Sequence, residues 1–153
     1  MFIGRHTNKV DKKGRISVPK PFRDALGDAS SSFYVFPSFK FPALEAFPRS
    51  FIEQFVVNLD ANHDLFSDAL DDLASTVLAN SQEIACDPEG RVILPKQFME
   101  HAQVGDEAVF VGQGRRFMIW SPALFEPHNA QAVERVRARG ATVPMRPAEK
   151  GEA

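Results

Sequence analysis

The sequence predicts an α+β fold, rich in β-strands, that is built from two copies of one small unit. A segment of twelve residues recurs at an offset of 76 residues, and short runs of β-branched and aromatic residues follow each copy. Apolar residues then recur at the helical steps of three and four. Because 44% of the 153 residues are hydrophobic, the chain can bury one moderate core or two small ones.

The repeated segment spans residues 11–22 and 87–98, which align without a gap. The identical positions are Asp11/Asp87, Gly14/Gly90, Arg15/Arg91, Pro19/Pro95, Lys20/Lys96 and Phe22/Phe98. Apolar residues at alternate positions within the segment indicate a strand with one half-buried face. The two copies are therefore expected to fold alike.

Each copy begins with the pattern Asp-x-x-Gly-Arg, which predicts a tight hairpin turn. The aspartate carboxylate can accept backbone N–H bonds within the turn, and glycine supplies a positive φ that residues with a Cβ rarely adopt. The residues predicted to hold the two turns structurally are Asp11, Asp87, Gly90 and Arg91.

Both copies are predicted to follow one order: strand, strand, helix, strand, strand, helix. The later strands are expected at residues 32–36, 43–47, 107–111 and 116–120. Phe51 and Phe55 recur at helical spacing in the first copy. In the second copy Ser121 and Pro122 supply an N-cap and a proline at the first helical position.

The apolar spacing between residues 64 and 78 predicts an amphipathic connecting helix. From residue 140 onward glycine, proline and charged residues follow no periodicity, which predicts a disordered tail. The expected organisation is a first repeat at 1–59, a connecting helix at 60–80, a second repeat at 81–139 and the tail at 140–153.

Several classes of protein are not expected. No apolar run approaches the roughly 18–20 residues that span a bilayer, and none has the pattern of a signal peptide. A cytoplasmic protein without membrane contact is therefore expected. The single cysteine, Cys86, has no partner in the chain, and the histidines lack metal-ligand spacing, so neither a metal nor a cofactor is expected. No paired carboxylates, activated nucleophile or phosphate loop is recognisable, which argues against an enzyme.

Charge is distributed unevenly although the formal net charge is only −2. Residues 1–26 hold seven basic and two acidic side chains, a balance of +5, whereas residues 27–86 hold two basic and nine acidic ones, a balance of −7. A positive end of this kind can attract and orient an anionic partner. A solvated basic terminus without a partner explains the same charge equally well.

Three features occur together in this sequence: the duplicated Asp-x-x-Gly-Arg turn, the apolar alternation and proline after it, and the opening Met-Phe-Ile-Gly. In these features the chain closely resembles the MraZ family of bacterial transcriptional regulators over roughly residues 1–140. The resemblance implies that each half is an AbrB- or SpoVT-type DNA-binding domain, a swapped-hairpin β-barrel that closes only when two copies interlock. One chain would then form an internal pseudo-dimer with flanking helices.

The resemblance also implies that chains assemble into a homo-oligomeric ring at the nucleoid. The ring would bind double-stranded DNA at direct repeats upstream of the division and cell-wall gene cluster, including the promoter of its own gene. Ring subunits related by rotation present similar turns in series along the DNA, so many weak contacts add up.

The residues expected from the resemblance to contact DNA are Arg5, Lys9, Lys12, Lys13, Gly14 and Arg15. An arginine at a hairpin tip can place its guanidinium on guanine O6 and N7 in the major groove, so Arg15 is expected to read sequence. The lysines would contact phosphates and position the turn.

Two alternatives stay open. Arg91 repeats Arg15 in a turn that reads Asp87-Pro88-Glu89, so the shared arginine could instead hold each hairpin through an ion pair with its own aspartate. The rival function is a non-catalytic oligomeric ring that binds a protein partner through a surface rich in phenylalanine.

Overall fold

The structure is a computed structural model that describes residues 1–27 and 32–145. Its strands are β1 (Arg5–Lys9), β2 (Arg15–Ser17), β3 (Ser32–Pro37), β4 (Leu44–Phe47), β5 (Gln82–Ala85), β6 (Arg91–Ile93), β7 (Glu107–Gly112) and β8 (Phe117–Trp120). Its helices are α1 (Lys20–Leu26), α2 (Arg49–Asn62), α3 (Asp68–Leu73), α4 (Lys96–His101) and α5 (Pro122–Arg139), with a π-helical segment η1 (Ala74–Leu78). The predicted α+β class is confirmed. The helices contribute more than a β-rich fold implies, since α5 has 18 residues and β3 and β7 have six each.

Strand pairing crosses repeatedly between the two copies of the repeat. One antiparallel sheet has the order β1-β7-β8-β4-β3-β5, and a second, two-stranded sheet pairs β2 with β6. Thus β1 of the first copy lies beside β7 of the second, and β5 of the second copy lies beside β3 of the first. Equivalent strands also pair with each other, β4 with β8 and β2 with β6.

The expectation of closed β-barrels is wrong for the part of the chain that the structure describes. The six-stranded sheet ends in β1 on one side and β5 on the other, so it is open. After each turn the chain leaves this sheet, and β2 and β6 form their own short ladder. Between the strands that flank the first turn, the described pairing is one bridge, Val10 with Ile16, because these strands belong to different sheets.

The main core lies between one face of the large sheet and a layer made of β2, β6, α1 and α4. Apolar positions shared by the two copies are buried together there, with Phe22 and Ile16 fully enclosed and Val92 and Phe98 almost so. Phe22 packs edge-on against Phe2 at 5.3 Å between ring centroids. Both copies therefore contribute to one core.

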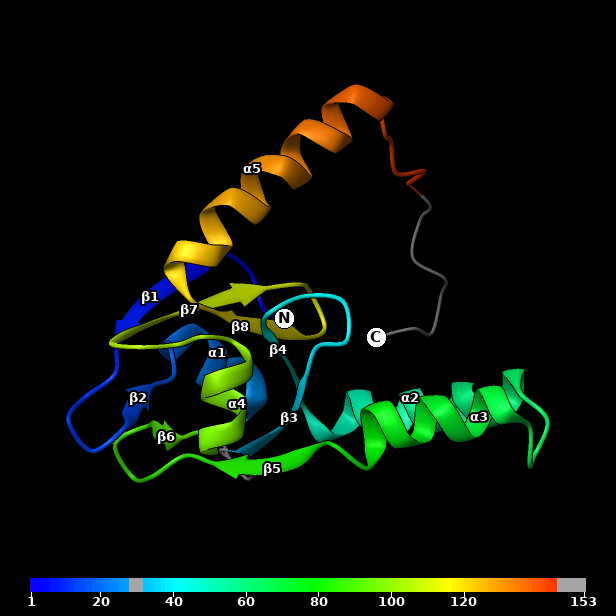
Figure 1. The fold of residues 1–153 in the computed structure, drawn as a ribbon, viewed down its shortest axis with the longest axis horizontal. Coiled ribbons are helices and arrows are strands. Elements are labelled where there is room, and N and C mark those ends of the chain that lie inside the picture. Colours follow the sequence, from blue (N-terminus) through cyan, green and yellow to red (C-terminus); the bar gives the residue numbers. More distant parts are fainter. Residues whose placement is uncertain (28–31, 146–153) are drawn as a thin grey trace.

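Helices cover the other face of the large sheet at its two sides. Side chains of α5 pack near Trp120, and those of α2 and η1 pack near Phe36 and Phe47. In Figure 1, α5 rises from one side of the sheet, and the arm formed by α2 and α3 extends from the other. The middle of this face of the sheet lies between α5 and the α2–α3 arm.

The predicted helices at the ends of the copies are confirmed, and the connecting helix is shorter than predicted. Residues 63–67 are not helical, and α3 begins at Asp68, because the Ser67 hydroxyl accepts the Leu70 N–H at 3.2 Å as an N-cap and Phe66 adopts a φ of 71°. Residues 141–145 have no regular structure, and the remainder of the predicted tail, 146–153, lies outside the described residues. None of the described helices is long and apolar enough to cross a membrane.

Candidate nucleic-acid interface

The first turn, residues 11–15, is held by the carboxylate of Asp11. Its Oδ1 accepts the backbone N–H groups of Lys13 at 2.9 Å and of Arg15 at 2.8 Å. Its backbone carbonyl accepts the N–H of Gly14 at 3.0 Å, and Gly14 has a φ of 80°. The aspartate thus fixes the loop from inside, and the glycine permits the reversal of the chain.

Asp11 also binds the side chain of Arg15. Arg15 Nε lies 2.6 Å from Asp11 Oδ2, and the two side chains are about one third exposed. The backbone hydrogen bond from Arg15, followed by the Arg15 side-chain bond and the Lys13 backbone bond, holds the pKa of Asp11 below its usual value despite some desolvation. The arginine is therefore preorganised at the turn, with Nε committed to the aspartate.

The second turn, residues 87–91, repeats these contacts and adds one. Asp87 Oδ1 accepts the N–H groups of Glu89 and Arg91, both at 2.9 Å, and its Oδ2 accepts Arg91 Nε at 2.9 Å. The backbone bond from Arg91 is the main reason why the pKa of Asp87 is lowered. Arg91 Nη2 also pairs with Glu89 at 3.0 Å, so its guanidinium faces two carboxylates.

The structure brings the two turns to one end of the molecule (Figure 1). In the β2–β6 ladder Arg15 lies opposite Ile93, and Ser17 lies opposite Arg91. Arg15 and Arg91 line a common hollow together with Cys86. Burial raises the pKa of the Cys86 thiol, which keeps it neutral and a poor nucleophile.

The two turns differ in the charge that they present to solvent. Lys12 and Lys13 are exposed at the tip of the first turn, and Lys9 is exposed at the end of β1 just before it. Within the described residues none of these three lysines has an ion-pair partner. The second turn presents Pro88 and Glu89 at the positions of Lys12 and Lys13. The cationic surface therefore belongs to the first turn.

Arg5 stands apart from the other residues predicted to contact DNA. It occupies the start of β1, about 13 Å from the Lys9 end of the strand at the usual rise per residue. Its guanidinium pairs with Glu126 at 3.2 Å and lies 5.5 Å from the centre of the Phe125 ring. Arg5 is thus held against α5, whereas Lys12, Lys13, Gly14 and Arg15 lie in the first turn and Lys9 lies just before it.

Sequence reasoning missed Arg23, which joins the first copy to the second turn. Its Nε donates to the Val18 carbonyl at 3.1 Å, and the Val18 N–H donates to the Gly90 carbonyl at 2.9 Å. A Cβ added to Gly90 would lie 2.5 Å from Arg23 Nη1, whereas one added to Gly14 would meet nothing within 4 Å. Met99 occupies the position of Arg23 in the second copy, and this asymmetry was the available signal.

Comparison with known proteins identifies the family. The family model described as "MraZ protein, putative antitoxin-like" matches residues 77–142. A protein of Gluconacetobacter diazotrophicus named transcriptional regulator MraZ is 38% identical over 157 aligned residues, which cover 100% of this chain and 98% of that protein. The chain belongs to the MraZ family. Regulators of the same name from Parvibaculum lavamentivorans and Azorhizobium caulinodans are 41% and 36% identical, covering 88% and 89% of this chain and 84% and 87% of those proteins.

Membership in the MraZ family applies to both copies of the repeat. The family model begins at residue 77 and so includes the second turn and α5. The alignment with the MraZ protein of Gluconacetobacter diazotrophicus spans the whole chain and so includes the first turn.

Proposed function

We propose that this chain is a sequence-specific transcriptional regulator that binds double-stranded DNA through its first turn. The observation that carries the proposal is the exposure of Lys12 and Lys13, without ion-pair partners in the described part of the chain, on a turn that hydrogen bonds hold rigid. Such cations bind the phosphate backbone and release counterions, which supplies much of the affinity for DNA.

The residues of the first turn divide between positioning and reading. Lys9, Lys12 and Lys13 contact phosphates, and Arg5 adds a more distant phosphate contact at the far end of β1. Gly14 lets the backbone approach the duplex, since the space beside its Cα is open. Arg15 reads bases with the guanidinium nitrogens that Asp11 does not use, because Nη1 and Nη2 form an edge that can make a bidentate contact with guanine.

The exchange of strands between the copies supports an internal pseudo-dimer of the AbrB type. β1 and β5 each pair with the opposite copy, and the two turns emerge side by side. In this proposal chains further assemble into a ring at the nucleoid in the cytoplasm, so that first turns meet direct DNA repeats in series. The repeats lie upstream of the division and cell-wall genes, including the promoter of the protein's own gene.

Fluorescence anisotropy tests the proposal with a labelled DNA fragment from upstream of the protein's own gene and a scrambled fragment of equal length. Wild type, Arg15→Ala and the control Lys96→Ala are compared across a salt series. We expect wild type and Lys96→Ala to prefer the upstream fragment and Arg15→Ala to lose that preference. Equal binding of both fragments by wild type contradicts the regulator. Salt-independent binding of DNA contradicts phosphate contact and favours the rival function in protein binding.

A further inference from the structure

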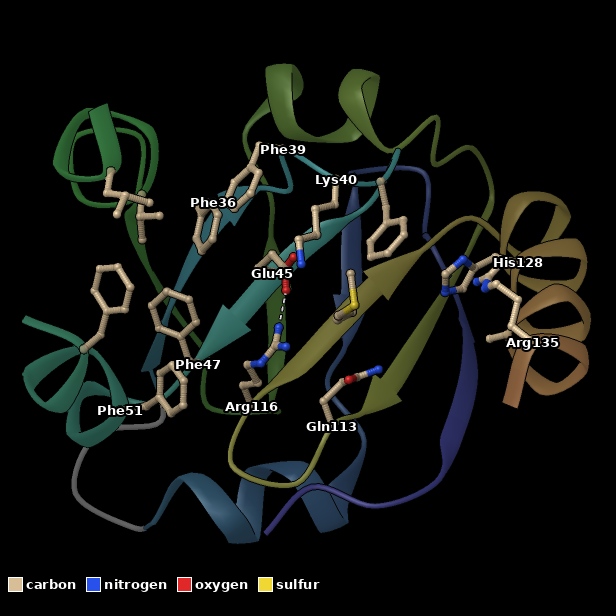
Figure 2. Close-up of a pocket in the computed structure, with 16 residues that line it drawn as sticks. Phe36, Phe39, Lys40, Glu45, Phe47, Phe51, Gln113, Arg116, His128 and Arg135 are labelled. Carbon is tan, nitrogen blue, oxygen red and sulfur yellow. Dashed lines mark hydrogen bonds and ion pairs between the residues drawn. The ribbon is translucent and has the colours of Figure 1, made fainter. Parts of the chain in front are cut away.

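An apolar groove with a cationic rim lies on the helix-covered face of the large sheet, between the α2–η1 arm and α5. Its volume is about 520 Å³, within the range of about 300–1,000 Å³ that is typical of binding pockets. Figure 2 shows the side chains that line it, among them Phe36, Phe39, Phe47, Phe51, His128 and Arg135. Phe39 is 60% exposed at the rim, which leaves a large aromatic side chain facing solvent.

The charges at this groove favour an acidic partner. Glu45 on the floor is buried, accepts a hydrogen bond from Ser38 Oγ at 2.9 Å and pairs with Arg116, so its charge is already compensated. Lys40 and Arg135 line the groove as well, are exposed and have no ion-pair partner within the described residues. The groove thus combines aromatic walls with uncompensated positive charge.

The tip of the α2–α3 arm has the complementary character. Leu65 and Phe66 are 74% and 86% exposed, and Asp64 and Asp68 flank them on the surface. Phe66 holds a φ of 71°, a left-handed conformation that is unfavourable for a bulky side chain. Residues 50–82 contain no lysine or arginine. The tip is therefore an exposed apolar pair in an acidic setting.

We propose that the α2–α3 tip of one copy inserts Leu65 and Phe66 into the groove of a second copy of this chain. The two side chains would pack between the aromatic walls, and Asp64 and Asp68 would face the cationic rim. A tip lies away from its own groove, because the groove is lined by Phe51 and Phe55 in the first half of the 14-residue helix α2 and the tip follows the far end of that helix. Figure 1 shows this arm pointing away from the sheet.

The contact is head-to-tail, since each copy uses a different surface for its two neighbours. Contacts of this kind build a ring when the rotation closes and a filament when it does not. The inference rests on the homo-oligomer of the proposed function and assigns the two surfaces through which its chains contact each other. It does not depend on DNA binding, because neither the tip nor the groove includes a residue of the first turn.

The first test measures self-association of the full chain without DNA, by light scattering and native mass spectrometry across a concentration series. Phe66→Asn removes the aromatic ring, and asparagine tolerates the left-handed conformation, so the arm keeps its fold. We expect wild type to form assemblies and Phe66→Asn to weaken them about tenfold or more. The control Val143→Asn removes a similarly exposed apolar side chain that neither lines the groove nor belongs to the tip, and it should assemble as wild type does.

The second test mixes Phe66→Asn, which lacks the tip surface, with Phe39→Asp, which lacks the groove surface. Phe39→Asp places a carboxylate on the groove rim, where it repels the acidic tip, and circular dichroism checks that both variants fold. At a concentration where wild type is assembled and Phe66→Asn is not, each variant alone should be monomeric, and an equimolar mixture should form a dimer of one chain of each kind and nothing larger. A monomeric wild type, unchanged assembly of either variant, or a mixture that stays monomeric overturns the inference. Arg15→Ala should assemble as wild type does, so a failure of DNA binding is distinguishable from a failure of this contact.

Discussion

The turn at residues 11–15 and the turn at residues 87–91 share one framework of hydrogen bonds and differ in what they display. In both, the aspartate accepts two backbone N–H groups and the Nε of the arginine. The two residues between aspartate and glycine are lysines in the first turn and Pro88 and Glu89 in the second. The comparison teaches that the aspartate, glycine and arginine build the loop, and that the two variable positions decide which loop can approach an anion.

The largest expected effect comes from reversing the charge of the first turn, residues 11–15. Lys12→Glu with Lys13→Glu should weaken binding of the upstream DNA fragment about a hundredfold, since two phosphate contacts are replaced by repulsion. The salt dependence should fall as well, by about 0.9 in log–log slope for each lost phosphate contact. Anisotropy titrations at several salt concentrations measure both quantities.

Lys96→Glu is the control for this charge reversal, with half the change in net charge, because Lys96 is exposed and lies on α4, outside the two turns. Its DNA affinity should stay near that of wild type. Should Lys96→Glu weaken binding as much as the double variant does, the positive charge of the whole chain rather than the first turn would be responsible.

A smaller effect should separate the two arginines. Arg15→Lys keeps the charge and removes the planar fork that a bidentate contact with guanine needs. The preference for the upstream fragment over a scrambled one should fall about tenfold, which corresponds to about 1.4 kcal/mol, with little change in salt dependence. Competition titrations with unlabelled DNA measure the preference. Arg91→Lys should keep the full preference, and a loss in both variants would assign base contacts to both turns.

The two glycines should differ in what they contribute to stability. Gly14→Ala and Gly90→Ala both place a Cβ at a positive φ, which costs about 1–2 kcal/mol. Gly90→Ala also pushes Arg23 away from its bond with the Val18 carbonyl, so it should cost about 1 kcal/mol more. Urea unfolding measures the free energies. With Arg23→Ala in the background the difference should vanish, and a difference that persists would place the strain elsewhere.

The smallest effect concerns acid, where the two turns should behave alike. The pKa of Asp11 and that of Asp87 are lowered in the folded chain, so the folded state binds fewer protons than the unfolded state near the ordinary value of about 4. Each carboxylate therefore contributes stability that is present above that pH and is lost as the pH falls through its folded pKa. Asp11→Asn and Asp87→Asn should each flatten the fall in urea midpoint on acidification. A flattening confined to one variant would show that the shared framework is unequal in strength.

Local features of the structure could be predicted well from the sequence. The position of each turn follows from an aspartate and a glycine three residues apart, because the carboxylate and the positive φ act within one loop. The start of α5 follows from Pro122 at the first helical position, although the Ser121 side chain before it makes no capping hydrogen bond. The strands β3, β4, β7 and β8 follow from short runs rich in β-branched and aromatic residues. The apolar spacing places the start of the connecting helix four residues too early, because the Phe66 conformation and the Ser67 cap have no periodic signal.

The sequence by itself determined that there are two equivalent units, where their turns lie and which turn is cationic, since repeats, turn residues and charges can be read along the chain. Tertiary structure alone decided which strands pair, so that β1 joins β7 and the sheet stays open rather than closing into barrels. It also decided that Arg5 binds Glu126, that Arg23 packs on Gly90 and that a groove lies between α2 and α5. The physical reason is that alternating apolar residues specify a strand with a buried face but not its neighbour, and contacts between residues far apart in sequence form only when the whole core assembles.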